Sequence, residues 1–168
     1  LERLVAERTA ALKEREHRLE LLAYQTRSVA STVDADGKYT YVSKVVETVL
    51  GYRPEELVGK MYFYDLHPEE GREAFKAEAL TVFANRGAFL DFMNPVQAKD
   101  GSIVWFSTNA LPMLNAQGQL LGYWGTEVDV TARKQAEDAV RDSEARMSSV
   151  LNNIEAYVYL KDAQYRYI

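Results

Sequence analysis

The sequence of 168 residues contains no cysteine. This absence excludes disulfide bonds, thiolate metal sites, cysteine nucleophiles and any photochemistry that requires a cysteine adduct, and it is typical of a reducing compartment. Long apolar runs are also absent, since no stretch of 18 or more residues is apolar, so we expect no membrane-spanning helix. We therefore predict a cytoplasmic segment that makes no membrane contact, whether or not a longer protein is anchored to a membrane upstream.

The sequence also contains few histidines and lacks a phosphate-binding motif. His17 and His67 are the two histidines of the sequence, and neither has an obvious partner for nucleophilic catalysis. We expect His17 on a solvated helix face and His67 in the turn before Pro68, with a metal or switching role for His67 as the alternative. No glycine-rich nucleotide-binding motif is present. We therefore predict no metal site and no enzymatic activity within these residues.

The composition is that of a soluble globular protein, with 47% hydrophobic and 27% charged residues. The formal net charge is −5 and the isoelectric point is about 5.2, so no overall attraction to nucleic acid is expected. The length suits one domain with appendages. Because the chain opens without methionine and its first eight residues do not resemble a signal peptide, we expect it to be a piece of a longer protein.

Heptad patterns occur near both ends of the chain. Residues 1–27 contain no glycine or proline, and mostly apolar residues recur there at alternating spacings of four and three, which would form a narrow stripe along a helix. A second stripe of this kind follows residue 131. The stripes consist of Leu1, Val5, Arg8, Leu12, Arg15, Leu19 and Leu22, and of Ala136, Val140, Ser143, Met147, Val150, Ile154 and Tyr157. We predict a homodimer through coiled coils, with Leu12, Leu19, Leu22, Val140 and Met147 in the seam. The alternative for residues 1–27 is a single helix folded back on the following domain.

Between the heptads the pattern is that of a small mixed domain at residues 28–131. Asp36-Gly37 between two β-rich runs is a strong hairpin signal. We predict strands at 28–33, 38–43, 88–98, 102–113 and 119–130, and helices at 44–50, 54–57 and 68–85. A helix at 132–153 follows. Residues 36–42 are repeated at 162–168, about 126 residues later, so we predict that 154–168 begins a second domain of the same kind.

Several short motifs together resemble the PAS domain of bacterial sensor proteins. They are the segment 51–60 (GYRPEELVGK), the turn 66–70 (LHPEE), the hairpin 99–102 (KDGS) and the closing Asp129-Val130-Thr131. The resemblance implies an α+β fold with a five-stranded antiparallel sheet, short helices on one face and flanking coiled-coil helices. In that family the inner face of the sheet encloses a small-molecule pocket. We expect both sheet faces to be covered, since residues 102–113 are apolar on both sides.

The resemblance also implies which cofactors to expect. Haem-binding relatives place a histidine where this chain has Phe75, and flavin photosensors place a cysteine where it has Tyr62. The residues that read the flavin edge correspond to Val96, Phe106 and Glu127, which replace two amides and a glutamine. We therefore predict neither haem nor flavin as a cofactor.

The predicted inner face is aromatic and mostly uncharged. It consists of Tyr62, Phe63, Phe75, Leu90, Phe92, Asn94, Phe106, Thr108, Tyr123 and Glu127. These residues either line a pocket for a small, partly apolar ligand or fill a solid core. The inward carboxylate of Glu127 requires an internal cation or a bound proton, unless the predicted strand register is wrong by one residue.

These observations lead to two functional hypotheses. The first is a sensory and dimerisation module of a bacterial signalling protein, of the histidine kinase or diguanylate cyclase type, whose output domain lies elsewhere. A small ligand would act through Asp129 and Thr131 on the C-terminal helix, with Thr131 capping the helix and Asp129 pairing with Arg133. The alternative is a structural PAS spacer that binds no ligand and only mediates dimerisation.

Overall fold

A computed structural model describes residues 2–153, 163, 164 and 166. The chain folds as two compact units, residues 1–131 and residues 132–168. The predicted start of a second domain at 154–168 lies almost entirely outside the described residues, as do the heptad positions Ile154 and Tyr157.

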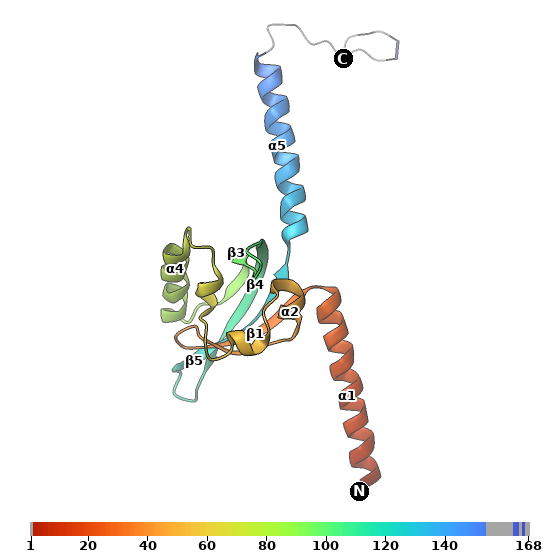
Figure 1. Ribbon diagram of the computed structural model, residues 1–168, viewed down its shortest axis with the longest axis vertical. Coiled ribbons are helices and arrows are strands. Elements are labelled where there is room, and N and C mark those ends of the chain that lie inside the picture. The colour runs from red at the N-terminus through yellow and green to blue at the C-terminus, as the bar shows by residue number, and fades with distance from the viewer. Residues whose placement is uncertain (1, 154–162, 165, 167–168) are drawn as a thin grey trace. The chain divides into compact units, whose positions relative to one another are not determined.

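The first unit is built around a five-stranded antiparallel sheet, which confirms the predicted α+β PAS fold (Figure 1). The strands lie in the order β2-β1-β5-β4-β3. Their bounds are β1 Ser28–Asp34, β2 Tyr39–Val42, β3 Phe89–Gln97, β4 Ile103–Leu114 and β5 Leu120–Asp129. The Asp36-Gly37 hairpin forms because Asp34 Oδ1 accepts the N–H groups of Asp36 and Lys38 and because Gly37 has a φ of 89°.

Four short helical segments lie between β2 and β3. They are α2 Val45–Leu50, α3 Pro54–Leu57, the 3₁₀ turn η1 Phe63–Leu66 and α4 Arg72–Ala84. α2 ends as predicted at Gly51, which has a φ of 75°. α4 begins four residues later than predicted, because Gly71 adopts the left-handed conformation at its N-cap and residues 69–71 form a turn. η1 has no counterpart among the helices predicted from the sequence.

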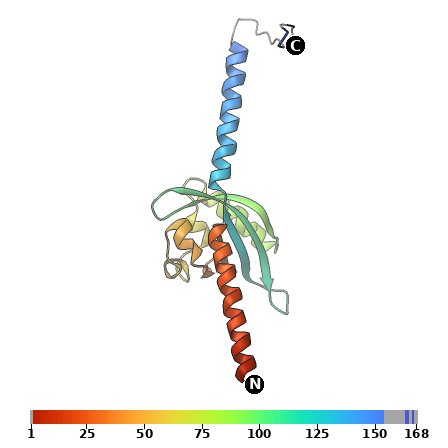
Figure 2. The same cartoon turned by 90° about the vertical axis from the view of Figure 1, so that its right-hand side faces the viewer.

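The helical segments lie on one face of the sheet (Figure 2). The buried core of this unit lies between these segments and that inner face. Leu57 of α3 has no exposed surface, and Val46 of α2 is nearly as buried. A second cluster forms where Ala79 and Phe83 of α4 meet Tyr123 of β5. The two clusters leave space between them, and this space is the site described below.

The outer face of the sheet carries an apolar row across four strands. Thr32 of β1 pairs with Tyr41 of β2 and with Trp124 of β5, and Trp124 pairs with Leu111 of β4. Tyr41, Trp124 and Leu111 are 52%, 51% and 53% exposed. These three side chains are therefore exposed in the single chain, because the helical segments α2, α3, η1 and α4 pack on the inner face. The expectation that a flanking helix or a second protomer covers the outer face stays a prediction.

The heptad residues that the structure describes lie on two long helices, α1 Glu2–Gln25 and α5 Thr131–Asn153. Leu12, Leu19 and Leu22 of α1 are more than half exposed, and so are Val140 and Met147 of α5. The exposure of Leu12 and Leu19 argues against an N-terminal helix folded back on the domain. The dimer seam stays a prediction.

Candidate functional site

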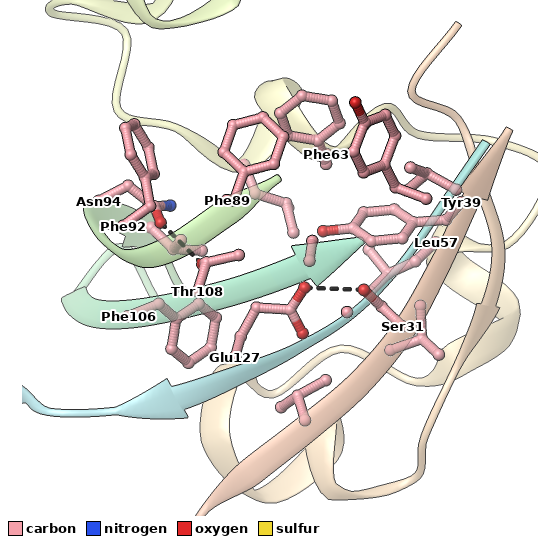
Figure 3. Close-up of a pocket in the computed structure, with 18 of the residues that line it drawn as sticks. Ser31, Tyr39, Leu57, Phe63, Phe89, Phe92, Asn94, Phe106, Thr108 and Glu127 are labelled. Atoms are coloured by element: carbon pink, nitrogen blue, oxygen red, sulfur yellow. Dashed lines mark hydrogen bonds between the residues drawn. The ribbon is translucent and has the colours of Figure 1, made fainter. Parts of the chain in front are cut away.

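The inner face of the sheet and the helical segments enclose a cavity of about 80 Å³ (Figure 3). All five strands contribute to one wall, and α2, α3, η1 and α4 contribute the other. Eight residues from the predicted pocket line it: Phe63, Phe75, Phe92, Asn94, Phe106, Thr108, Tyr123 and Glu127.

Two of the residues predicted for the inner face lie elsewhere. The Tyr62 ring stacks on Tyr64, with centroids 5.0 Å apart, and Lys38 Nζ lies 5.0 Å from the Tyr62 centroid, so this side chain does not line the cavity. Leu90 is 72% exposed. The reason is a β-bulge, since three residues of β3 from Phe89 onward oppose two residues of β4, and Asp91 has a φ of 47°.

The bulge places Phe89 in the cavity wall instead of Leu90. The Asp91 N–H donates to Asn109 Oδ1 at 3.0 Å, which stabilises the left-handed residue. Phe89 then meets Phe92 edge to face, with centroids 5.6 Å apart. Strict alternation along a strand cannot reveal such an inserted residue, because the shift depends on a side chain of the neighbouring strand.

Aromatic rings form most of the remaining wall. Phe63 meets Phe75 edge to face at 5.8 Å, and Phe75 stacks on Phe92 at 6.1 Å. On its other side Phe75 stacks on the buried ring of His67, at 4.6 Å, so His67 supports the wall rather than forming part of it. These contacts hold the rings in fixed orientations around the cavity.

Glu127 is the acidic residue of the cavity lining, and among the residues that the structure describes no lysine, arginine or histidine lines this cavity. Its Oε1 accepts a hydrogen bond from Ser31 Oγ at 2.7 Å. Its Oε2 is buried and has no hydrogen-bond partner among the described residues. Burial raises the pKa of this carboxyl to about 7, although the Ser31 hydrogen bond opposes the shift. The predicted strand register is therefore correct, and of the two other possibilities the arrangement favours a bound proton over an internal cation.

Ser31 and Tyr39 also line the cavity, although neither was predicted from the sequence to do so. Ser31 lies between Val29 and Val33 on β1, where the alternation of buried residues gave a usable signal. The Tyr39 hydroxyl points into the cavity on the side of Glu127 (Figure 3). Burial, and then the nearby Glu127 carboxylate, raise the pKa of this phenol far above its usual value. On the opposite side, Thr108 Oγ1 donates to Asn94 Oδ1 at 3.0 Å.

Asp129, the last residue of β5, contacts Thr131, the first residue of α5. Asp129 Oδ1 accepts hydrogen bonds from the Thr131 N–H at 3.0 Å and from Thr131 Oγ1 at 2.6 Å. The Thr131 hydroxyl oxygen accepts the Trp105 N–H of β4 at 2.9 Å. The Thr131 hydroxyl is therefore hydrogen-bonded to β4 and β5 of the sheet. The expectation that it caps an N–H group of α5 is wrong.

The ion-pair partner of Asp129 also differs from the prediction. Arg27 Nε, two residues after the end of α1, lies 2.6 Å from Asp129 Oδ2. Arg133 instead pairs with Glu137 on its own helix, at 3.6 Å. Partial burial opposes ionisation of Asp129, but the hydrogen bonds from Thr131 and Arg27 outweigh it and lower the pKa of this carboxyl. Arg27 is distant in sequence, so spacing alone could not identify it.

A family described as the PAS fold matches residues 25–135. The chain belongs to the PAS family. It is 28% identical over 144 residues to the nitrogen fixation regulatory protein of Klebsiella pneumoniae, covering 86% of this chain and 29% of that protein. It is 35% identical over 80 residues to the aryl hydrocarbon receptor nuclear translocator homolog of Drosophila melanogaster, covering 48% of this chain and 12% of that protein.

A solved structure shares the PAS fold. The sensory box histidine kinase/response regulator from Burkholderia thailandensis E264 superposes with a TM-score of 0.62 and 21% identity, covering 79% of this chain and 98% of that one. This chain spans less than a third of the length of each of the two relatives from Klebsiella pneumoniae and Drosophila melanogaster. Within the described residues, no three histidine, aspartate or glutamate side chains gather as a metal site, and no helix has the length and apolar character to cross a bilayer.

Proposed function

We propose that this PAS domain is the sensory module of a larger bacterial signalling protein, binds a small ligand in its inner cavity and relays occupancy to α5. The observation that carries the proposal is the unpartnered Oε2 of Glu127 beside the cavity. A buried polar atom without a partner costs about 1–3 kcal/mol, so its retention indicates that something in the cavity satisfies it. The output domain would be a kinase or cyclase, in keeping with the histidine kinase that shares this fold.

The relay would begin at the strand that carries Glu127. Asp129 lies two residues further along β5 and holds Thr131, the first residue of α5. Asp129 also forms an ion pair with Arg27. The same carboxylate therefore contacts both the segment just after α1 and the first residue of α5. A ligand that displaces β5 would therefore change both connections at once.

Dimerisation is the second part of the proposal. Two apolar surfaces are exposed to water in a single chain. They are the heptad residues of α1 and α5 and the outer-face row at Tyr41, Trp124 and Leu111. A parallel coiled coil would cover the heptads, and its register is the two-state element through which a signal would travel.

A ligand-free structural spacer is the second candidate, and the size of the cavity favours it. The volume of about 80 Å³ is well below the 300–1,000 Å³ that is usual for ligand pockets. Such a space holds two or three water molecules, which could satisfy Glu127 without any ligand.

Mass spectrometry separates the two candidates. The purified 168-residue chain is sprayed under native conditions and again after denaturation, and its mass is compared. A small molecule that is present only in the native spectrum supports the sensor. Identical masses, together with no shift of the cavity amide resonances when a metabolite extract is added, would support the spacer.

A further inference from the structure

Two complementary polar groups lie on the same side of the inner cavity. Glu127 Oε2 of β5 is buried and accepts no hydrogen bond from the described residues, because Ser31 Oγ donates to the other oxygen, at 2.7 Å. The Tyr39 hydroxyl of β2 points into the cavity on the side of Glu127 (Figure 3), and it has no hydrogen-bond partner among the described residues. An acceptor without a donor therefore lies on the same side as a donor without an acceptor.

The other hydroxyl protons of the lining are already donated within the described part of the chain. Ser31 donates to Glu127, Thr108 donates to Asn94, and Tyr123 donates to the Gly87 carbonyl at 2.7 Å. The Tyr39 hydroxyl is therefore the lining hydroxyl that can still donate to Glu127 Oε2.

The elements packed around Glu127 supply no counter-charge. Among the described residues, α2, α3, η1 and α4 line the cavity with apolar side chains, and the strands add neutral hydroxyls, the Asn94 amide and further apolar groups. Outside the lining, the Asp65 carboxylate of η1 acts on Tyr39 and helps to raise the pKa of that phenol, so Tyr39 stays a neutral donor. Burial without a cation favours the neutral form of Glu127 and raises its pKa to about 7.

The charge of Glu127 determines how strongly it attracts a donor. Hydrogen bonds to an ionised oxygen are shorter and about twice as strong as those between neutral groups. A neutral Glu127 therefore tolerates the arrangement in the structure, in which Tyr39 makes no bond to it. An ionised Glu127 requires a second donor beside Ser31, and the Tyr39 hydroxyl is in place to supply it.

We propose that this cavity is a proton-operated switch, in which neutral Glu127 leaves the Tyr39 hydroxyl free and ionised Glu127 draws it into a hydrogen bond to Oε2. The bond would pull Tyr39 of β2 toward β5, on the far side of β1, across a space of about 80 Å³. Asp129 lies two residues beyond Glu127 and contacts Thr131 and Arg27, so the movement would reach the junctions with α5 and α1. The switch needs no ligand and so goes beyond the proposed function, although it uses the same relay.

The test follows the carboxyl ¹³C resonance of Glu127 in the labelled 168-residue chain from about pH 5 to about pH 9. In the parent this carboxyl should titrate near neutral pH. Tyr39→Phe keeps the ring and removes the donor of the ionised form, so the midpoint should rise by about one pH unit. The matched control is Tyr41→Phe, which removes an exposed hydroxyl from the same strand and should leave the midpoint unchanged.

The relay is measured on the Thr131 and Arg27 amide resonances over the same range of pH. In the parent they should shift with the midpoint of the Glu127 carboxyl. Glu127→Gln keeps the side-chain shape and cannot ionise, so this titration should be lost, and shifts that survive belong to other titrating groups such as histidine. If that variant does not fold, Tyr39→Phe tests the relay instead, because the amide midpoints should rise together with that of the carboxyl.

Three results would overturn the inference. An unchanged midpoint in Tyr39→Phe would show that water, and not Tyr39, satisfies the ionised carboxylate. A Glu127 carboxyl that ionises near its ordinary value of 4.5, or stays neutral throughout, would show that no switch operates near neutral pH. A Thr131 amide that does not follow the carboxyl would show that the proton has only a local effect. None of these results decides whether the domain binds a ligand, which the native mass spectrum tests separately.

Discussion

Glu127 should make the stability of the domain depend on pH near neutrality. The pKa of this carboxyl is about 7 in the folded chain and 4.5 as an ordinary glutamate. Between these values the folded protein keeps a proton that the unfolded chain releases, so the contribution to stability is full below pH 4.5 and is lost as the pH rises through 7. At about 1.4 kcal/mol per pH unit, the loss amounts to roughly 3 kcal/mol, a large share of the stability of a small domain.

Urea unfolding of the parent chain and of Glu127→Gln measures this effect. The free energy of unfolding is determined at intervals from about pH 5 to about pH 8 for both proteins, and the difference between them is plotted. We expect the parent to lose stability relative to Glu127→Gln as the pH rises. Taking the difference removes the contributions of Asp129 and Glu56, whose pKa values are lowered and whose effects fall at acidic pH.

The exposed residue Glu47 supplies the matched control, since Glu47→Gln should follow the parent at every pH. Parallel curves for the parent and Glu127→Gln would refute the reasoning. They would mean that water reaches Oε2 and that the carboxyl ionises in the folded chain as it does in the unfolded one.

Three further predictions concern the seam, the cofactors and the relay. Leu12→Asp with Leu19→Asp should lower the sedimentation coefficient toward that of a monomer, and an unchanged coefficient would show that α1 is not the seam. The purified chain should be colourless, and a Soret band or flavin absorption would contradict the argument from Phe75 and Tyr62. Asp129→Ala and Thr131→Ala each remove the hydrogen bond between the Thr131 hydroxyl and Asp129, so each should cost about 1–3 kcal/mol. Each should also speed hydrogen exchange at residues 130–140 while the core stays protected. Arg133→Ala is the control, and global loss of protection or no change would refute a relay role for Asp129.

The sequence by itself determined the order of the strands and of the α-helices, and it identified part of the cavity wall. Asp36-Gly37 and Gly51 act through local backbone geometry, so their hairpin and helix end can be predicted without knowledge of the rest of the chain. Alternation along β4 and β5 likewise placed Phe106, Thr108 and Glu127 on the inner face, because side chains alternate along any regular strand.

The tertiary structure alone decided the features that depend on contacts between distant residues. The bulge that exchanges Leu90 for Phe89 is stabilised by Asn109 on the next strand. Asp129 pairs with Arg27, 102 positions away, rather than with the nearby Arg133. Whether the inward Glu127 has a partner depends on the side chains that five strands and four helical segments place around it, and no local sequence pattern predicts that arrangement. Packing at long range leaves one of its oxygens unsatisfied, and on that oxygen the proposed sensory function depends.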